Sequence, residues 1–224
     1  MRWRITGALL AGALFVAGMY AAAVRGLADA HYTSARLTLA EGTPASRAPS
    51  PEAIASALGA MRLALALEPG NPHFVEQAAR LQELHALGLQ PNDPVKRDSL
   101  RQSLARYREA AAMRPGSPYV WASIAMLKER LNNMDFEFYG ALERAGKLGP
   151  WEPQVQIAMI DVGLATWPWL AKPGRVWVLG ALERGLLRQA PEIRRIAAVH
   201  GNMSQICADA GGRSPRIAGL CVRK

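Results

Sequence analysis

Three pairs of prolines, each pair spaced three residues apart, constrain the fold of this chain more than any other feature. The pairs are Pro69 and Pro72, Pro115 and Pro118, and Pro150 and Pro153. Proline ends a helix because it lacks an N–H and its ring clashes with the preceding turn. The first helical position tolerates proline, since the N–H there is unpaired anyway. Each pair therefore predicts the end of one helix, a short turn and the start of another, with Asn71 and Ser117 as N-caps of two of them.

The composition also indicates a helical protein. Half of the 224 residues are hydrophobic, which is enough for a sizeable core, and the helix-favouring Ala, Leu, Arg and Glu are abundant. Sustained alternation of apolar and polar residues, the pattern of a half-buried strand, is almost absent. We therefore expect an all-α fold, with one ordinary domain and an appendage.

The proline-bounded segments resemble tetratricopeptide (TPR) repeats, which are helix hairpins with a period of 34 residues. The first prolines of the pairs are 46 and 35 positions apart, and an insertion at residues 88–98 accounts for the longer spacing. The small–bulky–small series of the family's second helix falls on Ala57, Met61 and Ala64, on Ser103, Tyr107 and Ala110, and on Phe138, Leu142 and Ala145. The resemblance implies an α-α superhelix of antiparallel helix hairpins over residues 52–200, of which residues 153–200 form a degenerate last unit. It also implies that Trp121, at the family's first-helix aromatic position, is buried between helices.

The N-terminus carries a second strong signal, an apolar segment long enough to cross a membrane. Arg2 and Arg4 precede residues 5–24, which contain no charge. About 20 apolar residues span the hydrocarbon core as a helix. The two arginines predict that the N-terminus stays in the cytoplasm and that the remainder lies across the membrane.

This segment is expected to be an uncleaved signal anchor, residues 1–25, followed by a stalk and linker over residues 26–51. A cleaved signal peptide is the alternative, because the small residues at 21–23 and 28–30 resemble cleavage sites. The apolar run favours the anchor, since it exceeds the roughly 7–15 residues usual in a signal peptide.

The formal charge of +9 is concentrated at the C-terminal end. Residues 172–224 carry ten Lys or Arg against three acidic residues, whereas residues 25–171 are neutral. In an exported protein such a surface can attract anionic lipid head groups or an acidic polysaccharide, and an ordinary solvated basic surface is the alternative. Nucleic acid is not expected as a partner in that compartment.

The last 24 residues, 201–224, are interpreted as a basic tail that contains both cysteines of the chain. An even number of cysteines in a short, loop-rich segment of an exported protein favours a disulfide, here between Cys207 and Cys221. No histidine stands near them, so they are poor candidates for zinc ligands.

No sequence motif predicts catalytic, cofactor-binding or metal-binding residues. The four histidines, His31, His73, His85 and His200, are scattered and form no metal-ligand pattern. Phosphate loops, dinucleotide fingerprints and nucleophile elbows are absent. Carboxylates mostly stand beside arginines on helix faces, where solvated ion pairs are the ordinary interpretation. An enzyme with an unfamiliar site is therefore the least favoured hypothesis.

A cluster of tryptophans, Trp151, Trp167, Trp169 and Trp177, allows two interpretations. Aromatic rings stack on sugar faces, so Trp151, Trp167 and Trp169 are candidates for a glycan-binding platform. In helical repeats, tryptophans more often fill the gaps between helix pairs, and packing is the favoured interpretation here.

A second resemblance is to bacterial proteins of the VpsP polysaccharide biosynthesis type. It rests on the N-terminal anchor, the turn that ends in Pro118-Tyr119-Val120-Trp121-Ala122, and the run from Leu142 to Pro153. The resemblance implies a non-catalytic accessory role in exopolysaccharide assembly or export, in which a partner protein of that system is bound. It implies a single-pass protein of the bacterial inner membrane, inserted through residues 5–24, with its bulk in the periplasm.

In the TPR family, partners bind on a groove formed by the first helices of the repeats. The positions that match this groove are His73, Glu76, Arg80, Glu83, Tyr119, Met126, Glu129, Arg130, Gln154 and Asp161. We therefore expect a scaffold that binds a partner protein there. The alternative is a carbohydrate-binding module that uses the tryptophans and the basic C-terminal end, with an acidic polysaccharide as the candidate ligand.

Overall fold

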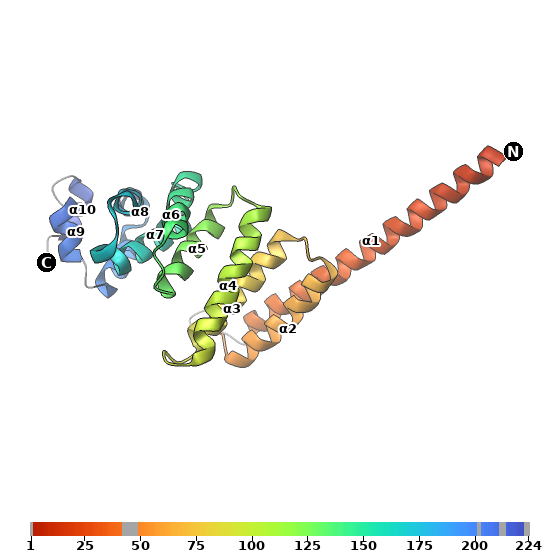
Figure 1. Ribbon diagram of the computed structural model, residues 1–224, viewed down its shortest axis with the longest axis horizontal. Coiled ribbons are helices and arrows are strands. Elements are labelled where there is room, and N and C mark those ends of the chain that lie inside the picture. The colour runs from red at the N-terminus through yellow and green to blue at the C-terminus, as the bar shows by residue number, and fades with distance from the viewer. Residues whose placement is uncertain (1, 42–48, 201–202, 211–213, 222–224) are drawn as a thin grey trace. The chain divides into compact units, whose positions relative to one another are not determined.

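The computed structural model describes residues 2–41, 49–200, 203–210 and 214–221, and each regular element among them is helical. The elements are α1 (Arg2–Glu41), α2 (Pro51–Leu67), α3 (Pro72–Gly88), α4 (Pro94–Met113), α5 (Pro118–Arg130), α6 (Phe136–Leu148), α7 (Pro153–Thr166), the 3-10 helix η1 (Trp167–Trp169), α8 (Lys172–Val199), α9 (Met203–Ala210) and α10 (Pro215–Cys221) (Figure 1). The expected all-α fold is confirmed for these residues. The chain divides into two compact units, Met1–Ser99 and Leu100–Lys224, with α4 running from one into the other.

The proline pairs define the helix boundaries as expected. Pro72, Pro118 and Pro153 each stand at the start of a helix. The Asn71 side chain caps α3 by accepting a hydrogen bond from the His73 N–H at 3.1 Å. Ser117 differs from the expectation: it precedes α5 with extended backbone but makes no side-chain cap hydrogen bond.

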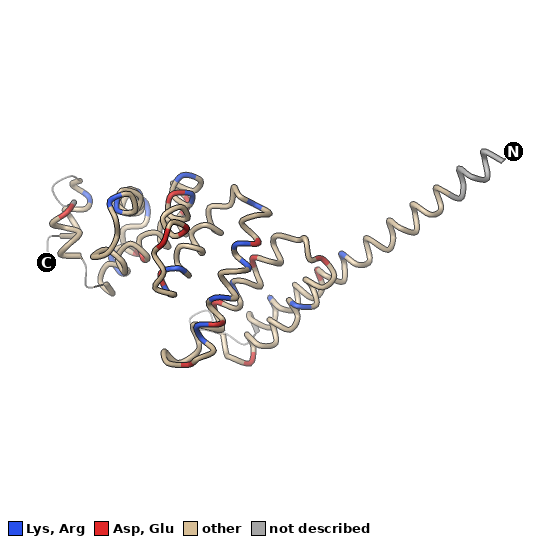
Figure 2. The backbone as a smooth tube through the Cα atoms, in the orientation of Figure 1, with Lys and Arg blue, Asp and Glu red and all other residues tan. Residues whose placement is uncertain are grey.

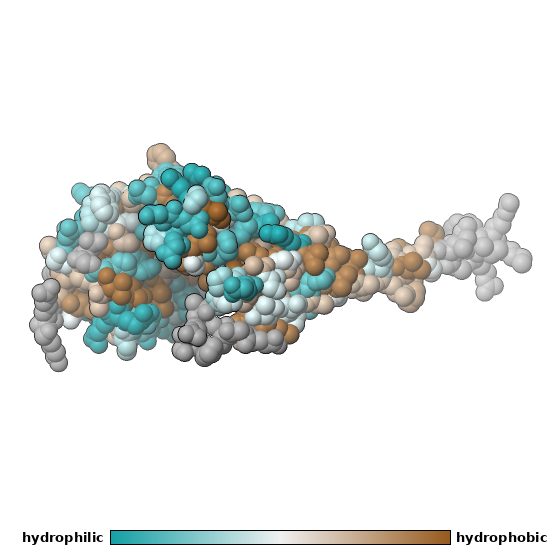
Figure 3. Space-filling model, turned by 90° about the horizontal axis from the view of Figure 1, so that it is seen from below, coloured by the Kyte–Doolittle hydropathy of each residue, from teal (hydrophilic) through white to brown (hydrophobic). Residues whose placement is uncertain are grey.

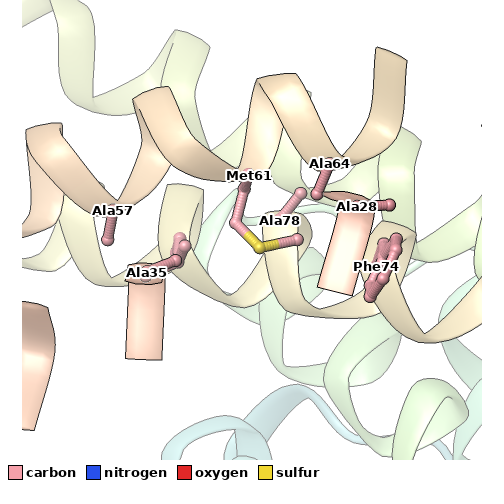
Figure 4. Packing of buried hydrophobic residues seen from close by; sticks show 8 residues of the cluster. Ala28, Ala35, Ala57, Met61, Ala64, Phe74 and Ala78 are labelled. Atoms are coloured by element: carbon pink, nitrogen blue, oxygen red, sulfur yellow. The ribbon is translucent and has the colours of Figure 1, made fainter. Parts of the chain in front are cut away.

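The core of the first unit lies between α1, α2 and α3. Met61 extends from α2 among small residues of the neighbouring helices, Ala35 of α1 and Ala78 of α3, and Phe74 closes one end of the cluster (Figure 4). Alanines at these positions allow the helix backbones to approach closely, and the flexible thioether fills the space that remains. The first unit is therefore a three-helix layer with a thin core.

The second half of α1 belongs to this core, which corrects the expected boundary at residue 25. Residues 26–41 were expected to form a stalk, but Ala28 and Ala35 are fully buried against α2 and α3. Tyr32 reaches His73 of α3, with 2.9 Å between its hydroxyl and Nε2. The linker that was expected up to residue 51 includes residues 42–48, which lie outside the described part of the chain.

The first half of α1 has no such packing. The described side chains from Leu10 to Ala23 are all exposed, including Leu14, Phe15 and Met19. Figure 2 shows no charged residue along this stretch, and Figure 3 shows hydrophobic residues there. Among the described residues, α1 is the one helix long and apolar enough to cross a membrane. The side chains of residues 5–9, the start of the expected membrane segment, are outside the description.

In the second unit, helices pack both with the next element and with the one after it. Helix α5 contacts α6 and α7, and α6 contacts α7 and α8. Close approach of α7 and α8 depends on Gly163, because a Cβ at this position would lie 2.2 Å from Val178 Cγ1. The core includes the fully buried Phe138, Leu142 and Ile160.

The C-terminal segment is part of this unit, although residues 201–224 were expected to be a tail. Helix α9 contacts η1, and α10 contacts α8. Ile206 and Ile217 are buried, and a disulfide joins Cys207 to Cys221 with 5.7 Å between their Cα atoms. Helices α9 and α10 thus pack onto the rest of the second unit through η1 and α8.

Candidate functional site

One candidate site is an open pocket of about 740 Å³ on the α1–α3 side of the first unit. Its lining residues are Tyr32, Ala35, Arg36, Leu39, Ala40, Pro49, Met61, Gln77, Arg80, Leu81 and Leu84. Most of them are apolar side chains at the edge of the core cluster, such as Leu39 and Leu84, which the core leaves partly uncovered. This volume is within the range of roughly 300–1,000 Å³ that is typical of ligand pockets.

Two arginines give this pocket its charge. Arg36 extends from α1 with its guanidinium carbon 5.7 Å from the centre of the Tyr32 ring. Arg80 extends from α3 and is exposed. No carboxylate in the described part of the chain pairs with either arginine, whereas Arg25 on the same helix as Arg36 does pair with Glu68, at 3.4 Å. The pocket therefore combines apolar walls with unpaired positive charge.

Of the four groove positions expected on α3, the structure places one in this pocket, Arg80. His73 turns to α1 and contacts Tyr32, in an edge-to-face arrangement with 5.0 Å between ring centroids. Glu76 and Glu83 are half-buried and engaged with other groups.

The wall supplied by α1 was missed, because its residues were interpreted as a stalk. The signal was present in the sequence: Ala28, Tyr32, Ala35 and Leu39 recur at the spacing of one helical face.

In the second unit, the expected groove positions fall on the neighbouring helices α5 and α7. At one end, the Tyr119 hydroxyl donates a hydrogen bond to Glu152, which raises the pKa of this tyrosine above its ordinary value. At the other end, Asp161 is 2.7 Å from Nε2 of His200, with Glu129 nearby. The two helices therefore run side by side in the same direction.

Burial raises the pKa of Glu129, and the proximity of Asp161 adds to this effect, while Arg130 and His200 oppose it. Glu129 and Arg130 are half-buried, and Arg130 is engaged with other groups. Met126 is also half-buried, and Gln154 is exposed. Most of the polar side chains on this face are therefore engaged by neighbouring groups.

Sequence reasoning also missed a buried ionic network. The side chain of Lys128 is only 1% exposed, and its Nζ lies 2.6 Å from Asp135 and 2.7 Å from Glu137. Arg108 binds the same Glu137 with two hydrogen bonds, of 2.7 and 2.6 Å. Hydrogen bonding from Arg108, with a further bond from Lys128, lowers the pKa of Glu137 to about 2 despite partial burial. Burial by itself would raise the pKa of Asp135, but its hydrogen bonds with Lys128 and with backbone N–H groups lower it.

Trp167 is packed, as the favoured interpretation of the tryptophans predicts, and is not part of the alternative glycan platform. This residue is 1% exposed, its indole N–H donates to Asp209, and Arg175 lies over its ring. Trp151 and Trp169 are exposed, but Trp151 lies under Arg184, with 5.9 Å from the guanidinium carbon to the ring centre. A continuous aromatic surface is therefore not formed by these residues.

Within the described residues, no group of three or more His, Cys, Asp or Glu side chains is arranged to hold a metal ion. Comparison with known proteins adds no family: no protein-family model matches the chain, and no curated protein matches it significantly in sequence.

Proposed function

We propose that this protein is a membrane-anchored, TPR-like helical scaffold that binds a partner protein in the α1–α3 pocket. The observation that carries the proposal is one continuous helix, α1, that combines an exposed apolar half with a second half that forms a wall of the pocket. Such a helix holds the pocket at a fixed distance from the membrane. The expected partner presents a hydrophobic side chain to the apolar walls and an acidic side chain to Arg36 and Arg80.

The spacing of contacts in the second unit supports a TPR-like arrangement. Residues joined across helices are 33 positions apart for Tyr119 and Glu152, 32 for Tyr139 and Ala171, and 33 for Gln156 and Gln189. Stacked hairpins with a period near 34 place residues of adjacent repeats in contact at these offsets. By the same logic, α1 and α3 take the first-helix positions of the first unit.

The proposal places the protein in the bacterial inner membrane with its bulk in the periplasm, on the basis of Arg2 and Arg4 before the apolar half of α1. A role in exopolysaccharide assembly or export is part of the proposal and is supported by the resemblance to VpsP-type proteins. Since the pocket combines apolar walls with cations, a protein partner is favoured over a sugar.

Site-specific photo-crosslinking in native membranes tests this function. A photoreactive residue at Leu84, which lines the pocket, is expected to form an adduct with one defined protein, and the adduct should disappear in the Arg36→Glu, Arg80→Glu double variant. Leu63, an exposed residue of α2, is the matched control position and is expected to give none. Equal adducts from both positions, or an adduct that survives the charge reversal, would contradict the proposal.

A further inference from the structure

A second pocket, in the second unit, lies between α4, α5 and α6 and has a volume of about 470 Å³. Its lining residues are Arg108, Ala111, Ala112, Pro115, Trp121, Ile124, Glu137 and Arg144. The pocket is separate from the α1–α3 pocket of the proposed function, and none of its lining residues belongs to the expected groove.

Arg144 is held over this pocket by stacking rather than by an ion pair. Its guanidinium carbon lies 4.4 Å from the centre of the Trp121 ring. Trp121, which was expected to be buried, is half-buried, and its indole N–H donates to the Pro115 carbonyl at 2.8 Å. The ring is thereby fixed in place as a platform for the arginine. No hydrogen-bond acceptor for the guanidinium of Arg144 is present in the described part of the chain.

A repeated sequence places a second arginine over a tryptophan, and this arginine does have an acceptor. The sequence Gly-Ala-Leu-Glu-Arg occurs at residues 140–144 and again at residues 180–184. Arg184 of the second copy lies over Trp151 and donates from Nε to the Pro150 carbonyl at 2.8 Å. The Pro115 carbonyl accepts from Trp121, just as the Pro150 carbonyl also accepts from Gln156 at 2.8 Å, but no hydrogen bond joins Arg144 to the Pro115 carbonyl. The guanidinium N–H donors of Arg144, unlike those of Arg184, are therefore available to bind another group.

The charges around the pocket favour an anion. Arg108, Lys128, Arg144 and Lys147 contribute four positive charges, and Asp135, Glu137 and Glu143 contribute three negative ones. Asp135 and Glu137 are engaged by Arg108 or Lys128, and Glu143 by Lys147, so the excess positive charge resides on Arg144. A planar guanidinium with unpaired donors matches a carboxylate, which it can bind with two parallel hydrogen bonds.

We propose that this pocket binds an acidic side chain of a protein, with a neighbouring aliphatic side chain against the exposed Ala112 and Pro115. A sugar acid offers the same carboxylate, but the face of Trp121 on which a sugar ring would stack is covered by Arg144. Sugar hydroxyls would also need acceptors, and the one carboxylate that lines the pocket, Glu137, already accepts from Arg108 and Lys128.

The test is a titration of the full-length, isotope-labelled chain in detergent, observed at the indole N–H signal of Trp121. The probes are N-acetyl-leucyl-glutamate amide and its glutamine counterpart, N-acetyl-leucyl-glutamine amide. The glutamate probe is expected to shift the Trp121 signal in a saturable way, and the glutamine probe to require at least tenfold higher concentration. Arg144→Gln is expected to weaken glutamate binding at least tenfold, and Arg144→Lys to an intermediate degree. Arg194→Gln, which alters another exposed arginine, is the control and should leave binding unchanged.

Equal binding of the two probes would overturn the proposal, as would undiminished binding by Arg144→Gln. Glucuronate is titrated in parallel. If glucuronate binds as tightly as the glutamate probe, the pocket does not select an acidic side chain of a protein and the inference fails. Because the readout is local to Trp121, failure here is independent of the crosslinking result at Leu84.

Discussion

Lys128 illustrates how a single buried charge determines the local design of the second unit. A buried ammonium is costly unless it is paired, and this one is paired with Asp135 and Glu137. Asp135 has a second role, since its side chain accepts hydrogen bonds from the N–H groups of Glu137 and Phe138 and so caps α6. The same carboxylate thus fixes the start of α6 and neutralises Lys128 of α5.

The carboxylate of Glu137 is expected to make stability depend on acid. Its folded-state pKa of about 2 is below the ordinary value of 4.5, so the folded state binds its proton more weakly than the unfolded state does. The stabilisation is fully present above pH 4.5 and is lost as the pH falls towards 2.

Glu137→Gln should therefore lower the unfolding free energy at pH 7 by about 1–2 kcal/mol, a value reduced for the part of the carboxylate that remains in water. The difference from the wild type should shrink between pH 4.5 and 2. Thermal melts over this pH range measure it, and Glu143→Gln on the same helix is the control, because the ion pair of Glu143 with Lys147 is exposed. A difference that stays constant down to pH 2 would contradict the assignment.

At the scale of helices, boundaries set by local signals could be predicted from the sequence, whereas those that depend on tertiary packing could not. The starts of α3, α5 and α7 could be predicted because proline acts on its own turn, whatever the rest of the chain does. The role of Ser117 could not, since a cap depends on the exact direction of the side chain. Helices α9 and α10 were missed because short helices are marginal alone and are stabilised by contacts, here with α8 and η1.

The candidate sites also differ in how far the sequence could predict them. Arg80 was placed on an exposed helix face by its match to a groove position of the TPR family. The pocket beside it depends on the packing of α1 against α2 and α3. This tertiary contact could not be predicted, because the second half of α1 directly follows the apolar membrane segment and was interpreted as a stalk. The pocket under Arg144 could not be predicted at all, because the stacking of Arg144 on Trp121 depends on how α5 and α6 pack.

Gly163 tests the close approach of α7 and α8. Alanine normally stabilises a helix relative to glycine by about 1 kcal/mol. At Gly163, however, the new methyl group would lie 2.2 Å from Val178, so the helices must separate. We expect Gly163→Ala to destabilise the second unit by about 1–3 kcal/mol, the usual cost of overpacking.

Two companion variants make this measurement specific. Val178→Ala removes the opposing methyl groups and should restore part of the stability when it is combined with Gly163→Ala, so that the two effects are not additive. Gly140→Ala is the control, because a Cβ there meets only Arg144, at an ordinary 3.7 Å. If Gly163→Ala is as well tolerated as Gly140→Ala, α7 and α8 are not packed through this glycine.

At the scale of the whole molecule, α1 is the helix whose two halves are suited to different environments, the first to a membrane and the second to the protein core. A helix of 40 residues is about 60 Å long, which is roughly twice the hydrocarbon thickness of a bilayer. Among the described side chains of α1, which begin at Leu10, the first buried one is Ala28. Arg25, which pairs with Glu68, lies one helical turn earlier. A membrane segment that ends near residue 24 therefore leaves the second half of α1 free to fold with α2 and α3.

Two truncations separate these roles. Removal of residues 2–24 should move the protein from the membrane fraction to the soluble fraction. The first unit should stay folded with little change in melting temperature, because the deleted side chains that the structure describes make almost no contact with α2 or α3.

Removal of residues 2–41 should also release the protein, but it takes away Ala28, Tyr32 and Ala35 and exposes Met61 and Phe74 of the core. The second truncation should therefore lose the thermal transition of the first unit, with hydrophobic-dye binding at room temperature as a second readout. If both truncations melt alike, α1 serves only as an anchor and forms no part of the pocket. If the shorter truncation remains in the membrane fraction, the apolar half of α1 is not what holds the protein there.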